Sequence, residues 1–125
     1  MFNHLSLGVR DLATARGFYD AFLAPLGAAV SAQSERELAY GPDGRESLFY
    51  LYPVEGPQVA GLGAHLAFTA PGRAAVDAAY ASAVSNGGTV IRAAGAHPDL
   101  GPDYYGAVLL DPDGNKLEIV AGTMH

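Results

Sequence analysis

Three polar side chains interrupt otherwise apolar segments of the sequence: His4 in FNHLSLGV, His65 in AHLAFT and Glu118 in KLEIV. Two imidazoles and one carboxylate suit Fe(II), Mn(II), Ni(II) or Zn(II), and three protein ligands leave coordination positions open for substrate oxygens. Any one of these residues alone would most simply pack or face solvent. Taken together they predict a divalent-metal site made by His4, His65 and Glu118.

Composition narrows the classes of protein further. The 125 residues include no cysteine, which excludes disulfides, thiolate nucleophiles and Cys-ligated metals. Seven Lys and Arg against 13 Asp and Glu give a net charge of −6, which argues against a nucleic-acid partner. No apolar run approaches the roughly 20 residues of a membrane span, and no signal-peptide pattern opens the chain. We therefore expect a cytoplasmic protein with no nucleic-acid or membrane partner.

The elements that must position these residues follow from periodicity and turn signals. The first half predicts a strand over 2–9, a helix after the N-cap Asp11, and strands over 28–33, 37–40 and 47–52. The second half predicts a strand over 64–69, a helix from Pro71 to Asn86, and strands over 89–92, 104–110 and 116–120. A long Gly- and Pro-rich loop over 93–102 contains His97.

Both halves share one order: strand, helix, three strands. His65 follows His4 by 61 positions in similar tetrapeptides, and the second Pro-Asp-Gly, at 112, follows the first, at 42, by 70. The repeat predicts one α+β domain of two βαβββ modules, with module one at 1–56, a linker at 57–63 and module two at 64–125. The difference in offset places an insertion of nine residues near His97. Two curved mixed sheets would pair around a cleft, because neither module can bury a core alone.

Pseudo-symmetry makes His4 and His65 equivalent and would point both into the cleft, with Glu118 joining from the last strand. The sequence is compatible with a cleft inside one chain and with a cleft across two. A homodimer is expected, because small proteins with exposed sheet edges tend to pair.

The sequence resembles the vicinal oxygen chelate superfamily, which groups glyoxalase I, extradiol dioxygenases, bleomycin-resistance proteins and fosfomycin-resistance enzymes. The matching segments are HLSLGVRDLATARGFYDAFLAPLG, HLAF and YYGAVLLDPDGNKLEIV. The resemblance implies paired βαβββ modules with metal ligands on the inner faces of the sheets, and it also points to a homodimer. His4, His65 and Glu118 fall on three of the family's ligand positions.

A fourth ligand of the glyoxalase pattern would come from the last strand of module one. Aligning the two Pro-Asp-Gly turns sets Leu48 opposite Glu118, and a slip of one or two residues gives Phe49 or Tyr50. Leu48 and Phe49 cannot bind a metal, and a neutral Tyr50 phenol would bind only weakly. The remaining two histidines and one glutamate resemble the ligand triad of extradiol dioxygenases.

The remaining candidates are catalytic residues and residues that line the substrate cleft. Glu118 and Tyr105 are the predicted catalytic residues, with a tyrosine available to move protons. Phe49, Tyr50, His97 and Tyr104 are predicted to line the substrate cleft, although the aromatic strand could instead serve as core and dimer face, and His97 could be an exposed loop residue.

The sequence thus predicts a divalent-metal-dependent enzyme that acts on a small substrate with vicinal oxygens, as an isomerase, a lyase or a ring-cleaving dioxygenase. The alternative is a metal-independent binding or drug-sequestering protein of the bleomycin-resistance type. A relict site in an assembly protein is the third hypothesis. Fosfomycin-type chemistry is disfavoured, because the seven cations are scattered along the sequence.

Overall fold

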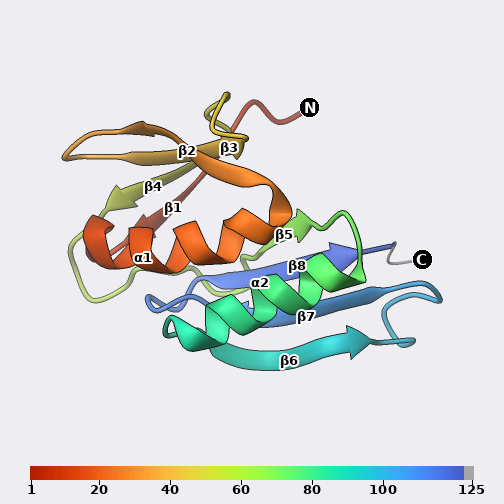
Figure 1. Ribbon diagram of the computed structural model, residues 1–125. Helices are drawn as coiled ribbons and strands as arrows, with labels where there is room; N and C mark the ends of the chain where they lie inside the picture. The colour runs from red at the N-terminus through yellow and green to blue at the C-terminus, as the bar shows by residue number, and fades with distance from the viewer. Residues whose placement is uncertain (123–125) are drawn as a thin grey trace.

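The computed structural model describes residues 1–122, which form two βαβββ modules (Figure 1). The first module consists of β1 (Leu5–Val9), α1 (Leu12–Leu23), the 3-10 turn η1 (Ala24–Leu26), β2 (Ala28–Gln33), β3 (Leu38–Pro42) and β4 (Phe49–Pro53). The second consists of β5 (Leu66–Thr69), α2 (Arg73–Ser85), β6 (Thr89–Ala96), β7 (Tyr105–Leu110) and β8 (Lys116–Ala121).

Each module folds into a four-stranded mixed sheet with the same topology. The strand orders are β1-β4-β3-β2 and β5-β8-β7-β6, and in each sheet the first strand pairs in parallel with the last. The other pairs are antiparallel. The predicted α+β fold of two βαβββ modules is confirmed. The two sheets remain separate and do not close into a barrel.

Local sequence signals determine where the helices begin and end. The Asp11 carboxylate accepts a hydrogen bond from the Thr14 backbone N–H at 2.9 Å, which caps α1. Pro25 falls in the 3-10 turn that follows α1, and Gly27 ends this turn at a φ of 84°, in the left-handed region that glycine adopts readily. In the second module α2 begins at Arg73, two residues after the predicted start, and Asn86 caps its end.

The offset between equivalent strands locates the insertion in module two. β1 and β2 begin at 5 and 28, and β5 and β6 at 66 and 89, so this offset is 61 for both pairs. β3 begins at 38 and β7 at 105, an offset of 67. The extra residues therefore lie in the longer β6 and the loop around His97, as expected. The strand starts give six extra residues (67 − 61), fewer than the nine predicted.

The strand β6 is longer than predicted. The segment over 93–96 was expected to be loop, but Gly95 and Ala96 pair with Gly106 and Tyr105 of β7. The small side chains that make this segment look like a loop also allow it to pass two register shifts, between Val90 and Arg92 and between Arg92 and Gly95.

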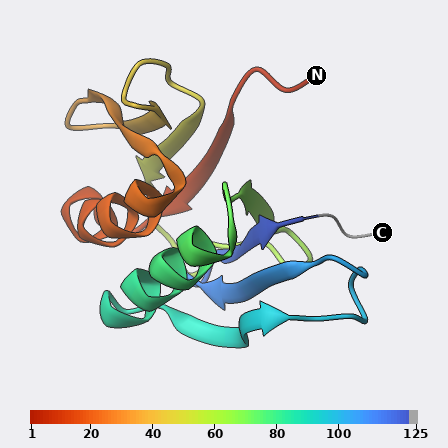
Figure 2. The same ribbon diagram turned by 45° about the vertical axis from the view of Figure 1, so that its right-hand side comes forward.

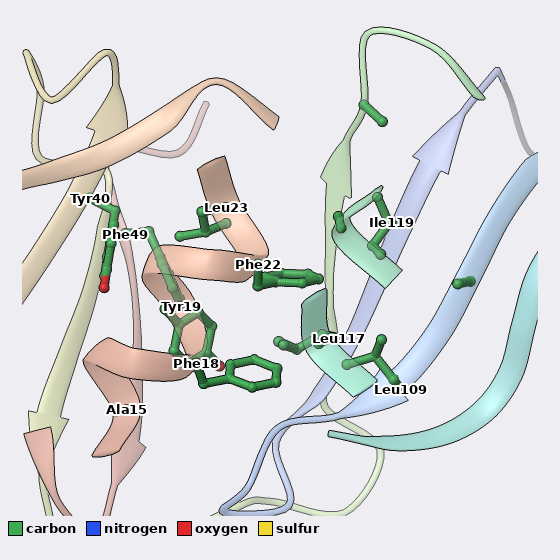
Figure 3. Packing of buried hydrophobic residues seen from close by; sticks show 14 of the residues in the cluster. Ala15, Phe18, Tyr19, Phe22, Leu23, Tyr40, Phe49, Leu109, Leu117 and Ile119 are labelled. Carbon is green, nitrogen blue, oxygen red and sulfur yellow. The ribbon is translucent and has the colours of Figure 1, made fainter. Parts of the chain in front are cut away.

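The hydrophobic core is shared by the two modules. The helices α1 and α2 lie side by side (Figure 2) and contact one face of each sheet. Phe22 of α1 reaches toward Leu117 and Ile119 of β8 (Figure 3), and its ring lies 5.6 Å from that of Phe68. Phe49 of β4 also contacts Phe68, at 5.4 Å between ring centroids. The predicted site residues Tyr50 and Glu118 therefore lie on the opposite faces of the two sheets, because they alternate with core residues along β4 and β8. Neither helix is long and apolar enough to cross a membrane.

Candidate functional site

The carboxylate of Glu118 is the centre of the polar cluster on the second sheet. Glu118 lies in β8 between Ala67 of β5 and Val108 of β7, and only 4% of its surface is exposed. Its Oε1 lies 3.3 Å from Nε2 of His65, and its Oε2 accepts a hydrogen bond from the Tyr104 hydroxyl at 2.7 Å. A buried carboxylate is retained only where partners offset its desolvation, and His65 and Tyr104 are those partners.

A surface hollow of about 230 Å³ opens over this pair. It is lined by His65, Ile91, Arg92, Leu100, Val108, Lys116 and Glu118. Two of the seven basic residues, Arg92 and Lys116, therefore lie at this hollow, although they are 24 positions apart in the sequence. Arg92 is bound by Asp99 at 2.9 and 3.0 Å, which lowers the pKa of the Asp99 carboxyl. Lys116 has no ion-pair partner among residues 1–122.

Sequence reasoning missed Arg92 and Lys116. The signal for Lys116 was present, because it stands two residues before Glu118 in the same strand and therefore shares its face. The signal for Arg92 was not present, because its place depends on the register of β6, where Arg92 pairs with Val108 across two irregularities. Only the folded sheet brings Arg92, Val108 and Glu118 into one row.

His4 lies on the other sheet. It is exposed just before β1, its Nδ1 is 2.7 Å from Oδ1 of Asn3, and its ring meets that of Tyr50 edge-on at 5.2 Å. In both ribbon views the segment before β1 runs away from the second sheet (Figures 1 and 2). Within residues 1–122 no three His, Asp or Glu side chains are grouped closely enough to hold a metal. The chain brings His65 and Glu118 together, but not His4.

The sheet registers identify the true counterpart of Glu118 in module one. Leu66 of β5 pairs with Leu117, so Ala67 faces Glu118. Leu5, the equivalent of Leu66, pairs with Phe49, so Ser6 faces Tyr50. Tyr50, not Leu48, therefore occupies the position equivalent to Glu118. The slip of two residues arises because Tyr50 follows Pro42 by eight positions, whereas Glu118 follows Pro112 by six.

The two histidines thus occupy equivalent pairs. His4 contacts Tyr50 in module one, and His65 contacts Glu118 in module two. Both modules place a histidine beside their last strand, but only module two places a carboxylate there.

The tyrosines after the His97 loop have different surroundings. The Tyr104 side chain is buried on Glu118, and burial, followed by that hydrogen bond, raises its pKa well above the ordinary value of a phenol. The Tyr105 hydroxyl donates to Asp77 of α2 at 2.7 Å, which raises the Tyr105 pKa. Of the two neighbours, Tyr104 is the one that the structure places on the Glu118 cluster.

The other residues predicted to line the cleft also differ in their surroundings. Phe49 is in the core, where it contacts Tyr19 and Phe68. Tyr50 lies on the opposite face of β4 and stacks on Tyr52, with ring centroids 6.0 Å apart and planes at 4°. His97 is partly buried, bonds the Ala93 carbonyl oxygen through Nε2 at 2.7 Å and lies 5.9 Å from the Tyr104 ring.

These features define a class of protein with duplicated βαβββ modules and a His–carboxylate pair on one open sheet face. The sequence matches the Glyoxalase/Bleomycin resistance protein/Dioxygenase superfamily over residues 1–119, and the chain belongs to this family. No curated protein matches the chain.

Solved structures agree with this assignment. A glyoxalase/bleomycin resistance protein from Albidiferax ferrireducens T118 is 32% identical with a TM-score of 0.82, covering 96% of this chain and 97% of that one. A glyoxalase-related enzyme from Fulvimarina pelagi shares the fold at 22% identity and a TM-score of 0.72, over 94% and 85% of the two chains. The fosfomycin resistance protein FosX from Mesorhizobium loti shares it at 18% identity and a TM-score of 0.69, over 99% and 93%.

Proposed function

We propose that the protein is a divalent-metal-dependent enzyme acting on a small substrate with two neighbouring oxygen atoms. The observation that carries this proposal is the buried Glu118 carboxylate, whose Oε1 lies 3.3 Å from His65 Nε2 at the hollow. An imidazole nitrogen and a carboxylate oxygen that converge in this way are two suitable ligands for Fe, Mn, Ni or Zn. Membership of the superfamily supports the same function.

His65 and Glu118 would hold the ion, and His4 is the proposed third ligand. Bound there, a divalent metal supplies Lewis-acid stabilisation of negative charge that develops on a chelated substrate oxygen. That step is common to isomerases, lyases and ring-cleaving dioxygenases, so the ligand set leaves these three reactions as alternatives within the proposal.

We propose that the third ligand comes from a second copy of the chain in a homodimer. His4 lies on the exposed face of the first sheet with Tyr50 and Tyr52, and Tyr52 is 37% exposed. Ile91, at the hollow of the second sheet, is 52% exposed. Apolar side chains exposed beside polar site residues on both sheets are typical of surfaces that another chain covers. Pairing the first sheet of one copy with the second sheet of the other would bring His4 to the His65–Glu118 pair.

The other residues of the hollow would act on the substrate itself. Lys116 would supply positive charge to orient an anionic or strongly polar substrate group, whereas the charge of Arg92 is already paired with Asp99. Ile91, Leu100 and Val108 supply apolar walls that would exclude water from the reacting centre. The catalytic role of Tyr105 stays a prediction, and Tyr105→Phe tests it once a substrate is known.

Metal binding by the purified protein tests the proposal. We expect uptake of Mn²⁺ or Co²⁺ at micromolar concentration, measured by calorimetric titration. Glu118→Gln and His65→Ala should abolish this uptake. Glu46→Gln is the control, because it removes an exposed carboxylate from the turn before β4. A wild-type protein that binds no divalent metal, or a Glu118→Gln variant that binds as well as wild type, would contradict the proposal.

A mixing experiment tests the dimer separately. His4→Ala and His65→Ala should each lose metal binding when alone. If the site is built across two chains, a mixture that exchanges subunits regains intact sites, about a quarter of the total for random pairing. A site completed within one chain predicts no recovery on mixing.

The stacked pair of Tyr50 and Tyr52, with His4 edge-on, supports a second candidate function. An exposed aromatic surface of this kind binds planar ligands without a metal, as a drug-sequestering protein would. Titration with bleomycin in the presence of EDTA tests this function. Leu62→Ala is the control, because the Leu62 side chain is fully exposed and lies outside this aromatic surface. Binding that is lost in Tyr52→Ala and kept in Leu62→Ala would favour the sequestering function over the enzymatic one.

A further inference from the structure

The Tyr104 hydroxyl is hydrogen-bonded to one of the two carboxylate oxygens of Glu118. It donates to Oε2 at 2.7 Å, while Oε1 lies beside Nε2 of His65. Tyr104 is 1% exposed, and Glu118 is 4% exposed. The carboxylate is therefore fixed at both oxygens, and only Oε1 is directed to the neighbouring imidazole.

Gly106 of β7 leaves the space in which the Tyr104 phenol reaches Glu118. A Cβ atom at Gly106 would lie 2.7 Å from the Tyr104 hydroxyl oxygen and 2.8 Å from Cζ, so any other residue there would displace the ring. The His97 ring lies near the same phenol, 5.9 Å between centroids. The absent side chain at Gly106 and the contact with His97 together hold Tyr104 in one place.

We propose that Tyr104 is a positioning residue that restricts Glu118 to binding the metal through Oε1 alone. This inference rests on the proposed function, because it assigns a role toward the metal ligand. A hydrogen bond from a neighbouring group orients a ligand and tunes its affinity for the ion, and removing such a bond typically weakens metal binding about 10–100-fold. Without the Tyr104 hydroxyl, the carboxylate would be free to rotate away from His65.

The test is Tyr104→Phe, which removes the hydroxyl and keeps the ring. Tyr40→Phe is the matched control. Tyr40, in β3 of the other sheet, is also 1% exposed and also donates to a carboxylate, Oδ1 of Asp20 in α1, at 2.8 Å. We expect Tyr104→Phe to weaken Co²⁺ binding about 10–100-fold and to change the visible spectrum of bound Co²⁺, whereas Tyr40→Phe should alter neither. Equal Co²⁺ affinities and spectra in wild type and Tyr104→Phe would overturn the proposal.

The crystal structure of metal-free Tyr104→Phe separates this inference from the proposed function. We expect the Glu118 carboxylate to leave its place beside His65 or to occupy several rotamers, while it stays in place in Tyr40→Phe. If wild type binds no metal, the proposed function fails, and this structure still decides whether Tyr104 positions Glu118. A Glu118 carboxylate unmoved in Tyr104→Phe would show that Tyr104 only fills space.

Discussion

The hydroxyl of Tyr19, in the helix of module one, donates to Oδ2 of Asp111, in the turn after β7 of module two, at 2.7 Å. Asp111 is 2% exposed, and its Oδ1 also accepts from the backbone N–H groups of Asp113 and Asn115. The Asn115 amide binds both Oδ2 of Asp111 and the carbonyl oxygen of Gly8 in β1. The Asp-Pro-Asp-Gly-Asn turn therefore joins the two modules.

The turn between β3 and β4 of the first module has no aspartate in the place of Asp111. Gly41 stands before Pro42 where Asp111 stands before Pro112. A Cβ at Gly41 would lie 1.6 Å from the Glu46 carbonyl oxygen, so the turn has no room for a side chain. Both Pro-Asp-Gly turns thus connect the third and fourth strands of their module, but within residues 1–122 only the second turn carries the side-chain bonds that join the modules.

We expect Tyr19→Phe to lower the free energy of unfolding by about 2 kcal/mol, because it removes a buried hydrogen bond to a charged acceptor. Asp111→Ala should cost more than about 3 kcal/mol, since it leaves a hydroxyl and several N–H groups without their acceptor. Urea unfolding measures both. Tyr105→Phe, which removes an exposed Tyr–Asp bond of the same length, should change stability little. Equal stability of all three variants would refute the role of Asp111.

The buried tyrosines predict the response to alkali. Burial is the main cause that raises the pKa of Tyr19, Tyr40 and Tyr104, and each also donates to a carboxylate. A raised folded-state pKa means that stability is fully present below the ordinary value of 10.0 and is lost as pH rises from there through the folded-state value. Phenolate absorbance should therefore rise in two steps, exposed tyrosines first and these three only with unfolding. Ionisation of all seven tyrosines before any loss of circular dichroism would contradict this expectation.

Gly106→Ala should disrupt both the sheet and the Glu118 cluster. The new methyl group would lie 2.2 Å from the Ile119 carbonyl oxygen as well as against the Tyr104 phenol. Overpacking of this kind costs about 1–3 kcal/mol, which thermal or urea unfolding would detect. Gly95→Ala is the matched control, because Gly95 pairs with Gly106 across the strands and a Cβ there meets nothing within 4 Å. A control as unstable as Gly106→Ala would show that strand pairing, not the Tyr104 contact, sets the cost.

Much of the fold was predictable because its signals are local. The N-cap Asp11, the glycine after η1 and the alternation in β8 all act within a few residues. The length of β6 was not predictable, since its small residues look like loop and its pairing depends on bulges. The position equivalent to Glu118 was displaced for a similar reason: module one has two more residues between the Pro-Asp-Gly proline and this position, and an alignment of the turns cannot detect them.

The same difference between local signals and long-range pairing applies to the candidate site. The sequence pointed to His65 and Glu118, and these side chains are in contact, because His65 directly precedes β5 and β5 pairs with β8, which carries Glu118. Tyr104, which donates to Glu118, and Arg92, which lines the same hollow, are placed by long-range pairing of β6, β7 and β8, which leaves no periodic signal in the sequence. His4 occupies the equivalent position on the other sheet, where its neighbour is Tyr50.

The equivalence of Tyr50 and Glu118 allows a ligand to be added by design. Tyr50→Glu would place a carboxylate beside His4 as Glu118 lies beside His65. If His4 joins the proposed metal site, this fourth donor should tighten Co²⁺ binding at least about tenfold, or about 1.4 kcal/mol.

Tyr52→Glu is the matched control for this substitution. It adds the same charge to the same sheet face and removes the same ring stack, but the register sets Tyr52 opposite Gly8, at the far end of β1 from His4. Calorimetric titration of both variants, with size-exclusion chromatography to follow assembly, measures the difference. Equal gains would point to a general effect of negative charge, and no gain in Tyr50→Glu would place His4 outside the metal site.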